Sequence, residues 1–177
     1  MGYVVLHLKK ASGNDAGTSA HIERTIHPKN ADESRTHLNR ELIGFPQSVK
    51  NRTEAIQHRI ENAGITRKIG KNQVRAIGVM LSASPDDMKR IEEAGHLNDW
   101  CAESVDWLQK TFGAENLVSA VLHRDATTPH IHATIVPIVT GERRKAKEEK
   151  STEGKKKYRK KNPICPEDAG LWIAAGH

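Results

Sequence analysis

The stretch "VLHRDATTPHIHATIVPI", residues 121–138, contains two apolar runs on either side of the turn-forming residues "ATTP". Short apolar runs separated by such a turn are typical of a β-hairpin, so we predict strands over 116–125 and 130–138. The second run includes His130 and His132, which stand one residue apart. Because side chains alternate along a strand, both imidazoles are expected on one face of the sheet, with the apolar residues between and after them on the other.

A third histidine, His123, lies near the end of the first predicted strand, and pairing within the hairpin would bring it close to the other two. A single histidine is more often a hydrogen-bonded, half-buried side chain, but three imidazoles on one sheet face favour a divalent metal site. Imidazole ligands favour Mn²⁺, Zn²⁺, Co²⁺ or Ni²⁺ over Mg²⁺, and we take Mn²⁺ as the first candidate. The uncompensated charge of such a site suits an anionic substrate such as phosphate. Asp125 could orient a ligand histidine through its other ring nitrogen, or could be a turn residue.

The rest of the chain predicts an α+β fold, because the expected elements follow the order strand, helix, helix, strand, helix, strand, strand. A loop is expected over 11–19, between the first strand and the first helix. Ser48 and Ser84 are the expected N-caps of the second and third helices. The remaining elements are a strand over 3–8, a helix over 33–42, a helix from Ser48 to about residue 63, a strand over 74–84, and one long helix from Ser84 to about Phe112.

The charge is distributed unevenly along the chain, whose net charge is +6. Residues 1–80 contain 13 basic and 7 acidic side chains, residues 81–141 contain 4 and 9, and residues 142–161 contain 11 and 4. A phosphate-binding face with an acidic back would produce this asymmetry. The lysine-rich run over 142–161 fits a solvated linker equally well.

The composition argues against a membrane or secreted disulfide-rich protein. No apolar run approaches the roughly 20 residues needed to span a membrane, and Met1–Leu8 is too short for a signal peptide. Cys101 and Cys165 are too few and too far apart for a disulfide framework or a zinc ribbon. We therefore expect a cytoplasmic protein. Its domain is expected over residues 1–140, and 141–177 is expected to be a basic, disordered segment that leads into a further, truncated element.

Three stretches of the chain resemble the motifs of plasmid mobilization relaxases of the Mob/Pre (MOBV) family. "AHIER" at 20–24 resembles the first motif, H-x-x-R. "NADESRTHLNREL" at 30–42 resembles the second, which ends in S-R-[ST]-H-L-N-x-E-L. "HRDATTPHIHA" at 123–133 resembles the third, H-x-D-x-x-x-P-H-x-H. The motifs occur in the family's order and cover residues 1 to about 138.

The resemblance implies an HUH-type endonuclease fold, with a central antiparallel sheet, helices packed on one face and the three-histidine metal site on the other. It also implies an activity. Such bacterial enzymes nick one strand of supercoiled DNA at a plasmid or mobile-element transfer origin, become attached to its 5′ phosphate and later rejoin the strand. The expected partners are single-stranded and supercoiled DNA at that origin and a conjugative coupling protein.

The resemblance also implies a nucleophile. Most HUH enzymes use tyrosine, and this chain has only Tyr3 and Tyr158. In Mob/Pre relaxases the histidine of the first motif is thought to attack instead, which here is His21. Glu23 could orient or deprotonate His21, and Arg24 could clamp a phosphate oxygen bidentately.

Further residues are candidates for contacts with DNA. In the second motif, Arg35, His37 and Asn39 could contact DNA or fix the predicted helix against the site. Basic residues before the second long strand are candidates for phosphate contacts, although they could also form a solvated turn: Arg67, Lys68, Lys71 and Arg75.

The chain departs from the family pattern at two positions. Ala126 follows the motif aspartate where the family often has Glu, which puts the strength of metal binding in doubt. Arg40 stands where the second motif often has Tyr. Two other functions also fit the sequence: a metal phosphoesterase that activates water, and a basic nucleic-acid-binding module whose histidines are structural.

Overall fold

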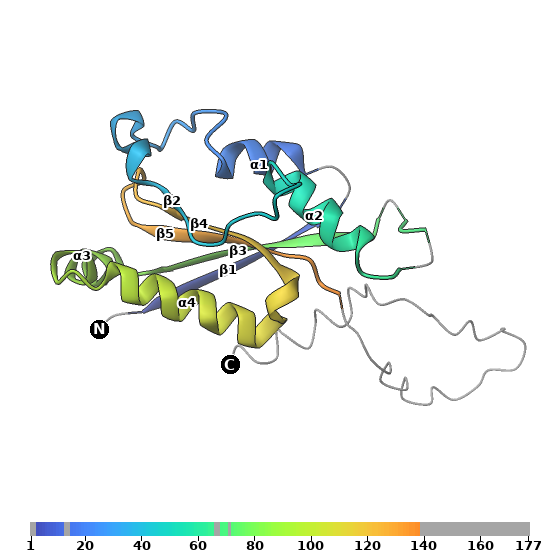
Figure 1. The fold of residues 1–177 in the computed structure, drawn as a ribbon. Coiled ribbons are helices and arrows are strands. Elements are labelled where there is room, and N and C mark those ends of the chain that lie inside the picture. The colour runs from blue at the N-terminus through green and yellow to red at the C-terminus, as the bar shows by residue number, and fades with distance from the viewer. Residues whose placement is uncertain (1–2, 13–14, 66–67, 71, 139–177) are drawn as a thin grey trace, which may run out of the picture.

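The computed structural model describes residues 3–12, 15–65, 68–70 and 72–138, which form a five-stranded sheet between two helical layers (Figure 1). The strands lie in the order β1-β3-β5-β4-β2, and each neighbouring pair is antiparallel. The strand bounds are Val4–Ser12 (β1), Arg40–Glu41 (β2), Val74–Ala83 (β3), Leu117–His123 (β4) and His130–Ile135 (β5).

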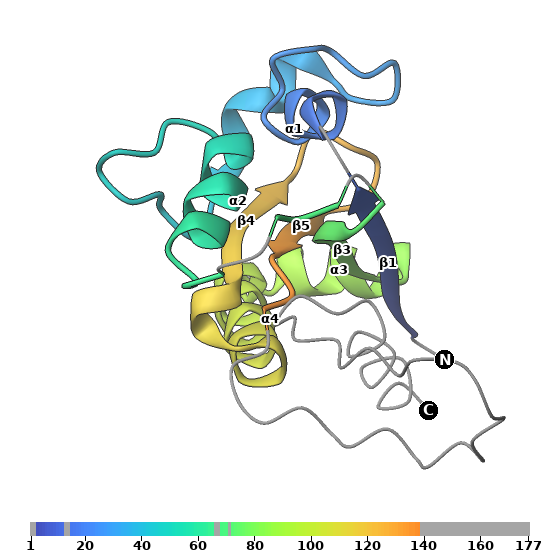
Figure 2. The same ribbon diagram turned by 90° about the vertical axis from the view of Figure 1, so that its right-hand side faces the viewer.

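The helices lie on both faces of this sheet. Figure 1 shows α3 and α4 below the sheet and α1 and α2 above it, and Figure 2 shows the same layers after a quarter turn. Their bounds are Ala16–Ile22 (α1), Arg52–Glu61 (α2), Pro85–Glu93 (α3) and Leu97–Phe112 (α4), with short 3-10 helices at Glu33–Leu38 (η1) and Ala114–Asn116 (η2). The antiparallel sheet, with α3 and α4 on one face and the three histidines on the other, is confirmed, and α1 and α2 also lie on the histidine face.

The alternation of side chains along β5 separates the core from the histidine face. Ile131, Ala133 and Ile135 are buried in the main core, which α4 covers. His130 and His132 alternate with them and so project to the opposite face. A second, smaller core on that opposite side packs α2 against the sheet through Ile56, Ile60, Ala76, Val136 and Ile138.

The strands β3, β4 and β5 lie where the sequence predicts them. The predicted cap is also confirmed, since the Ser84 side chain accepts a hydrogen bond from the Asp87 amide and Pro85 occupies the first turn of α3. The prediction of one helix from Ser84 to Phe112 is wrong. Gly95, with a φ of 76°, separates α3 from α4, because that left-handed backbone ends a helix.

Three other local predictions are also wrong. Residues 33–42 form a 3-10 helix followed by β2, whose two residues pair with β4. The cap of α2 is Asn51, whose side chain accepts from the Glu54 amide, instead of Ser48. The predicted loop over 11–19 contains the end of β1 and the start of α1. The predicted segment 141–177 lies outside the described residues.

Candidate active site

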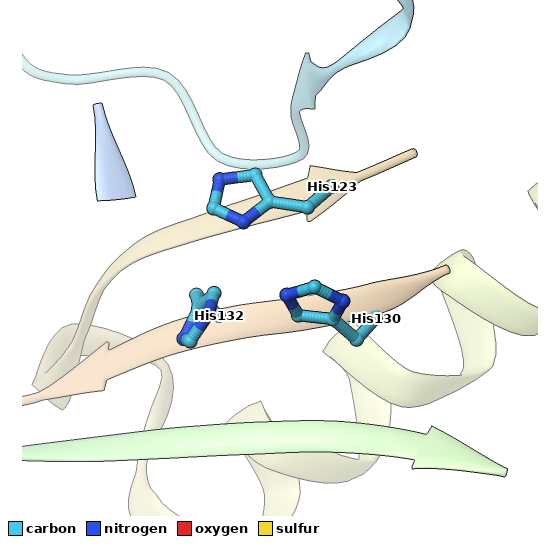
Figure 3. A group of neighbouring side chains, drawn as sticks. All are labelled: His123, His130 and His132. Carbon is cyan, nitrogen blue, oxygen red and sulfur yellow. The ribbon is translucent and has the colours of Figure 1, made fainter. Parts of the chain in front are cut away.

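The register of the β4–β5 hairpin brings the three histidines together. His123 pairs directly with His130, and His132 lies two residues further along β5. Figure 3 shows the three rings on one side of the two strands. One ring nitrogen from each lies within 4.8 Å of the others, and the ring centroids are 4.9–5.3 Å apart. The predicted three-histidine cluster is therefore present.

The environment of the cluster keeps its rings neutral at pH 7. Burial, followed by the charge of the nearby Arg24, lowers the pKa of His123 to about 4. Burial, together with His130 and His123, lowers the pKa of His132 to about 3. Burial also lowers the pKa of His130. Neutral imidazole is the form that coordinates metals, so the three rings are ready to act as ligands near neutral pH.

The hydrogen bonds of two rings determine which of their nitrogens carries the lone pair. His130 Nδ1 lies 2.9 Å from the Thr128 carbonyl oxygen and must donate to it, which leaves the Nε2 lone pair free. His123 Nε2 donates to the Ile22 carbonyl oxygen at 2.8 Å, so the lone pair is on Nδ1, where it accepts from Arg24 Nη2 at 3.1 Å, a bond that a metal ion would have to replace. Metal-binding histidines commonly donate their other N–H to a backbone carbonyl in this way. The donor set therefore fits a divalent metal.

Arg24 bonds several protein groups beside this cluster. Its Nε and Nη2 donate to the two carboxylate oxygens of Asp125 at 2.7 and 2.8 Å. Nη1 donates to the His21 carbonyl oxygen at 2.6 Å, and Nη2 lies 3.1 Å from His123 Nδ1. The phosphate clamp expected of Arg24 stays a prediction, and the contacts of its guanidinium in this structure are with protein groups. Arg24 connects the end of α1, the turn after β4 and one candidate ligand.

Asp125 acts on the cluster through Arg24 instead of contacting a histidine ring. Its side chain is buried, and hydrogen bonds from Arg24 and Asn39 hold its pKa well below the usual range. Asn39 Nδ2 donates to Asp125 Oδ2 at 2.7 Å, and Asn39 Oδ1 accepts from the Arg124 amide at 2.8 Å. These bonds fix the end of η1 against the site, which fits the second of the two roles predicted for Asn39, and its contact with DNA stays a prediction. Arg35 is half-buried and His37 is exposed on η1.

His21 lies on the last turn of α1 and faces the cluster. Its ring centroid is 6.1 Å from that of His132, in an edge-to-face arrangement. Within the described part of the chain, neither ring nitrogen of His21 forms a hydrogen bond. Burial, followed by the charge of Arg24, lowers the pKa of His21. Its neutral ring therefore carries a free lone pair beside the candidate metal ligands.

Glu23 faces away from His21. Its Oε1 accepts a hydrogen bond from the backbone N–H of Arg52 at 2.5 Å, at the start of α2. The structure thus gives Glu23 a contact between two helices in place of the expected contact with His21. Tyr3 precedes β1 at the sheet edge with a 61% exposed side chain, while Tyr158 lies outside the described residues.

The four basic residues expected to contact DNA are only partly described. Lys68 is exposed, whereas Arg75 lies half-buried on β3 with its Nε lacking a hydrogen-bond partner among the described residues. Arg67 and Lys71 lie outside the described residues. Sequence reasoning missed Arg52, which is fully buried next to α1, because a charged residue in a first helical turn gives no sign of burial.

No helix in the part of the chain that the structure describes has the length and apolar character required to cross a bilayer.

The chain resembles known plasmid proteins in sequence. A family model described as "Plasmid recombination enzyme" (Mob/Pre) matches residues 1–170. The "65 kDa protein" of Zymomonas mobilis subsp. mobilis is 34% identical over 131 residues, which cover 72% of this chain and 21% of that protein. The "Plasmid recombination enzyme" of Streptococcus agalactiae is 28% identical over 145 residues, covering 80% of this chain and 29% of that one. The chain thus spans less than a third of the length of these two relatives.

It also resembles solved structures. The relaxase domain of MobM (MOBV; Mob/Pre), Mn-bound and in complex with a 22-nucleotide oriT DNA of plasmid pMV158, matches with a TM-score of 0.69 and 28% identity. That match covers 79% of this chain and 73% of the MobM chain. A complex of the same domain with 23-nucleotide oriT DNA, also Mn-bound, matches with a TM-score of 0.68 and 26% identity.

Proposed function

We propose a function that proceeds from one established premise: the chain belongs to the Mob/Pre family of plasmid recombination enzymes. The proposed function is that of a relaxase, which nicks one DNA strand at a plasmid or mobile-element transfer origin for conjugative mobilization. One observation carries it. The neutral His21 faces a cluster of three neutral histidines on one sheet face, which places a candidate nucleophile beside a candidate metal site.

His123, His130 and His132 would hold the divalent ion. Mn²⁺ is the first candidate because the MobM relaxase domain is Mn-bound, and Zn²⁺, Co²⁺ and Ni²⁺ are alternatives. When bound, the ion would act as a Lewis acid that polarises the scissile phosphate and stabilises its developing charge. Asn39 donates to Asp125, Asp125 accepts from Arg24, and Arg24 contacts His123 and the end of α1.

His21 is the proposed nucleophile. Its ring nitrogen attacks the scissile phosphorus, a P–N bond forms, the bond from phosphorus to the 3′ oxygen breaks, and that oxygen takes up a proton. The imidazole loses the proton of its other nitrogen to solvent, so the product is a phosphoramidate between His21 and the 5′ phosphate. Reversal of the same steps rejoins the strand. Tyr3 is the weaker candidate, because it lies on the sheet edge two strands away from β5.

The proposed partner is DNA at the transfer origin, in supercoiled and single-stranded form. The MobM relaxase domain, which this chain resembles, is bound to 22- and 23-nucleotide oriT DNA of plasmid pMV158 in its solved complexes. Arg35, His37, Lys68 and Arg75, with Arg67 and Lys71 outside the described residues, are proposed to contact the DNA backbone or flanking bases. A conjugative coupling protein is the proposed protein partner.

The test is a nicking assay on supercoiled plasmid that carries the DNA flanking the gene, with Mn²⁺ or with EDTA. Products are resolved with and without protease treatment. The expected result is a Mn²⁺-dependent nick with protein on the 5′ end, which is lost in His21→Ala. The matched control is His96→Ala, because His96 is an exposed histidine between α3 and α4, on the layer opposite the site.

Each other outcome favours a different function. A nick with a free 5′ end would mean that water attacks, as in a metal phosphoesterase. Binding that resists EDTA, without cleavage of any DNA tested, would favour a nucleic-acid-binding module. A protein-linked nick that persists in His21→Ala would point to Tyr3 or Tyr158 as the nucleophile.

A further inference from the structure

The helix that carries His21 cannot fix its own position. α1 has seven residues, and its cap residue, Asp15, makes no side-chain hydrogen bond to the helix. Only Ser19 and Ile22 of this helix are buried. Isolated helices shorter than about 12 residues are marginal in water, so tertiary contacts must decide where α1 lies. Those contacts therefore also decide where His21 lies relative to the three-histidine cluster.

Arg52 makes several of these contacts. It is the first residue of α2 and is fully buried. Its Nη1 donates to Ser19 Oγ at 2.9 Å and forms an ion pair with Asp15 Oδ2 at 2.7 Å. Its backbone N–H donates to Glu23 Oε1 at 2.5 Å. One residue thus holds the position before α1, the middle of α1 and the position directly after it.

The same side chain is bonded to the strand of the candidate ligands. Arg52 Nε donates to Thr134 Oγ1 at 2.6 Å, in a buried contact. Thr134 lies two residues after His132 in β5 and therefore points to the same face of the sheet. A continuous path of bonds connects the cluster to α1: it runs from β5 through Arg52 to Ser19, which lies two residues before His21.

The chemistry of Arg52 favours a role in geometry over one in stability. Moving a guanidinium out of water costs several kcal/mol, and an apolar residue of similar volume often packs as well or better. A buried arginine fork nevertheless holds several acceptors in one fixed arrangement. We propose that Arg52 is a positioning residue that sets the placement of His21 against the three-histidine cluster. This inference rests on the proposed nicking function.

The first test separates turnover from binding. The variant is Arg52→Met, and the matched control is Arg59→Met on the same helix, whose side chain contacts Asn116 and Glu115 at the far end of α2. With an oligonucleotide that contains the mapped nick site, we expect kcat to fall roughly 100-fold, because small misplacements of reacting groups have effects of this size. KM and the Mn²⁺ dissociation constant should stay within about two-fold. Arg59→Met should match the wild type in all three.

The second test needs no DNA. Hydrogen exchange of the Glu23 amide, which is bonded to the Ser19 carbonyl oxygen, reports the opening of α1. We expect Arg52→Met to speed this exchange by at least roughly 10-fold while β5 exchanges as in the wild type. If the wild type nicks no DNA, the proposed function fails, and this measurement still decides whether Arg52 holds α1.

Milder variants keep the proposal testable if Arg52→Met does not fold. Thr134→Val and Ser19→Ala remove one acceptor each from Arg52 and leave the charge pair with Asp15 in place. We expect each to lower kcat by roughly 10-fold without a change in KM. The proposal would be overturned if both variants kept the kcat and the Glu23 amide exchange rate of the wild type. Equal losses of kcat in Arg52→Met and Arg59→Met would overturn it as well.

Discussion

Arg24 adopts a φ of 55°, a backbone conformation that costs a non-glycine residue free energy. The bonds that this conformation permits explain why the site tolerates it. With the chain turned sharply after α1, the guanidinium reaches Asp125, His123 and the carbonyl oxygen of His21 together. A lysine could not replace it, because only the planar fork bonds both carboxylate oxygens while a third nitrogen bonds elsewhere.

Substitution of Asp125 should therefore be costly. We expect Asp125→Asn to lower the free energy of unfolding by about 3–5 kcal/mol, because Arg24 would keep a buried charge without its partner. Asp106→Asn breaks an exposed pair with Lys110 and should cost about 0–1 kcal/mol. Urea denaturation of both variants measures this difference. Equal losses of unfolding free energy in the two variants would show that the buried Arg24–Asp125 pair stabilises the fold no more than the exposed pair does.

The ligand role of the cluster has an equally direct test. We expect His132→Ala to weaken Mn²⁺ binding by more than about 100-fold, since losing a direct ligand should exceed the 10–100-fold effect of losing a supporting group. His7 is an exposed histidine on the edge strand β1. It pairs with Met80 of β3, and Met80 pairs with His132. Calorimetric titration of His7→Ala should give wild-type affinity. Tight binding in His132→Ala would remove that ring from the ligand set.

At the scale of elements, the break between α3 and α4 results from one residue. The apolar stripe from Met88 to Phe112 continues across it, so periodicity alone predicts a single helix. Gly95 takes a φ of 76°, and its amide bonds the Glu92 carbonyl oxygen. The turn lets two shorter helices pack separately against the same sheet face.

Replacing this glycine should be unfavourable through the backbone alone. A Cβ on Gly95 would meet no atom within 4 Å, so any loss comes from the positive φ, and we expect Gly95→Ala to cost about 1 kcal/mol. Gly17 lies in α1 without a positive φ and with open space around its Cα, so Gly17→Ala should instead stabilise by up to about 1 kcal/mol. Thermal unfolding would show shifts of opposite sign. An unchanged unfolding temperature in Gly95→Ala would mean that the turn adapts to the added Cβ.

For the whole molecule, the histidine cluster makes the metal-free stability depend on pH. His123 and His132 have folded pKa values of about 4 and about 3, while the unfolded chain titrates near 6.5. The unfolded state therefore binds more protons below pH 6.5, so stability is complete above that pH and falls on acidification. The depressed pKa of Asp125 adds a further loss only below about pH 4.

Urea denaturation at pH 7 and pH 5 measures this dependence. We expect the free energy of unfolding to fall by about 2 kcal/mol for each of His123 and His132 over this interval. In the variant His123→Gln/His132→Gln, the difference between the two pH values should shrink by most of that amount. A difference that is unchanged in this variant would show that other groups cause the dependence.

The predicted domain boundary at residue 140 remains a prediction. The structure describes nothing beyond residue 138, whereas the family model matches as far as residue 170. A chain that ends at residue 140 should retain the wild-type unfolding free energy if the predicted boundary is correct.

Much of the fold and of the site follows from local patterns. The period of two in β5 places His130 and His132 together on one face, and the turn "ATTP" brings His123 beside them. Ser84 and Pro85 mark the start of α3 for equally local reasons. By contrast, β2 is only two residues long and exists through its pairing with β4, so no pattern within it could reveal a strand.

Strand alternation and turn chemistry act over a few residues, so the order of the amino acids alone dictates which residue types share a sheet face. Packing between distant segments decides that His21 faces His132 and that Arg52 is buried between α1 and Thr134. Packing also decides that Arg24 bonds Asp125, a residue 101 positions away. These contacts join segments that are distant in the chain, and their free energy exists only once packing has excluded water from the groups involved.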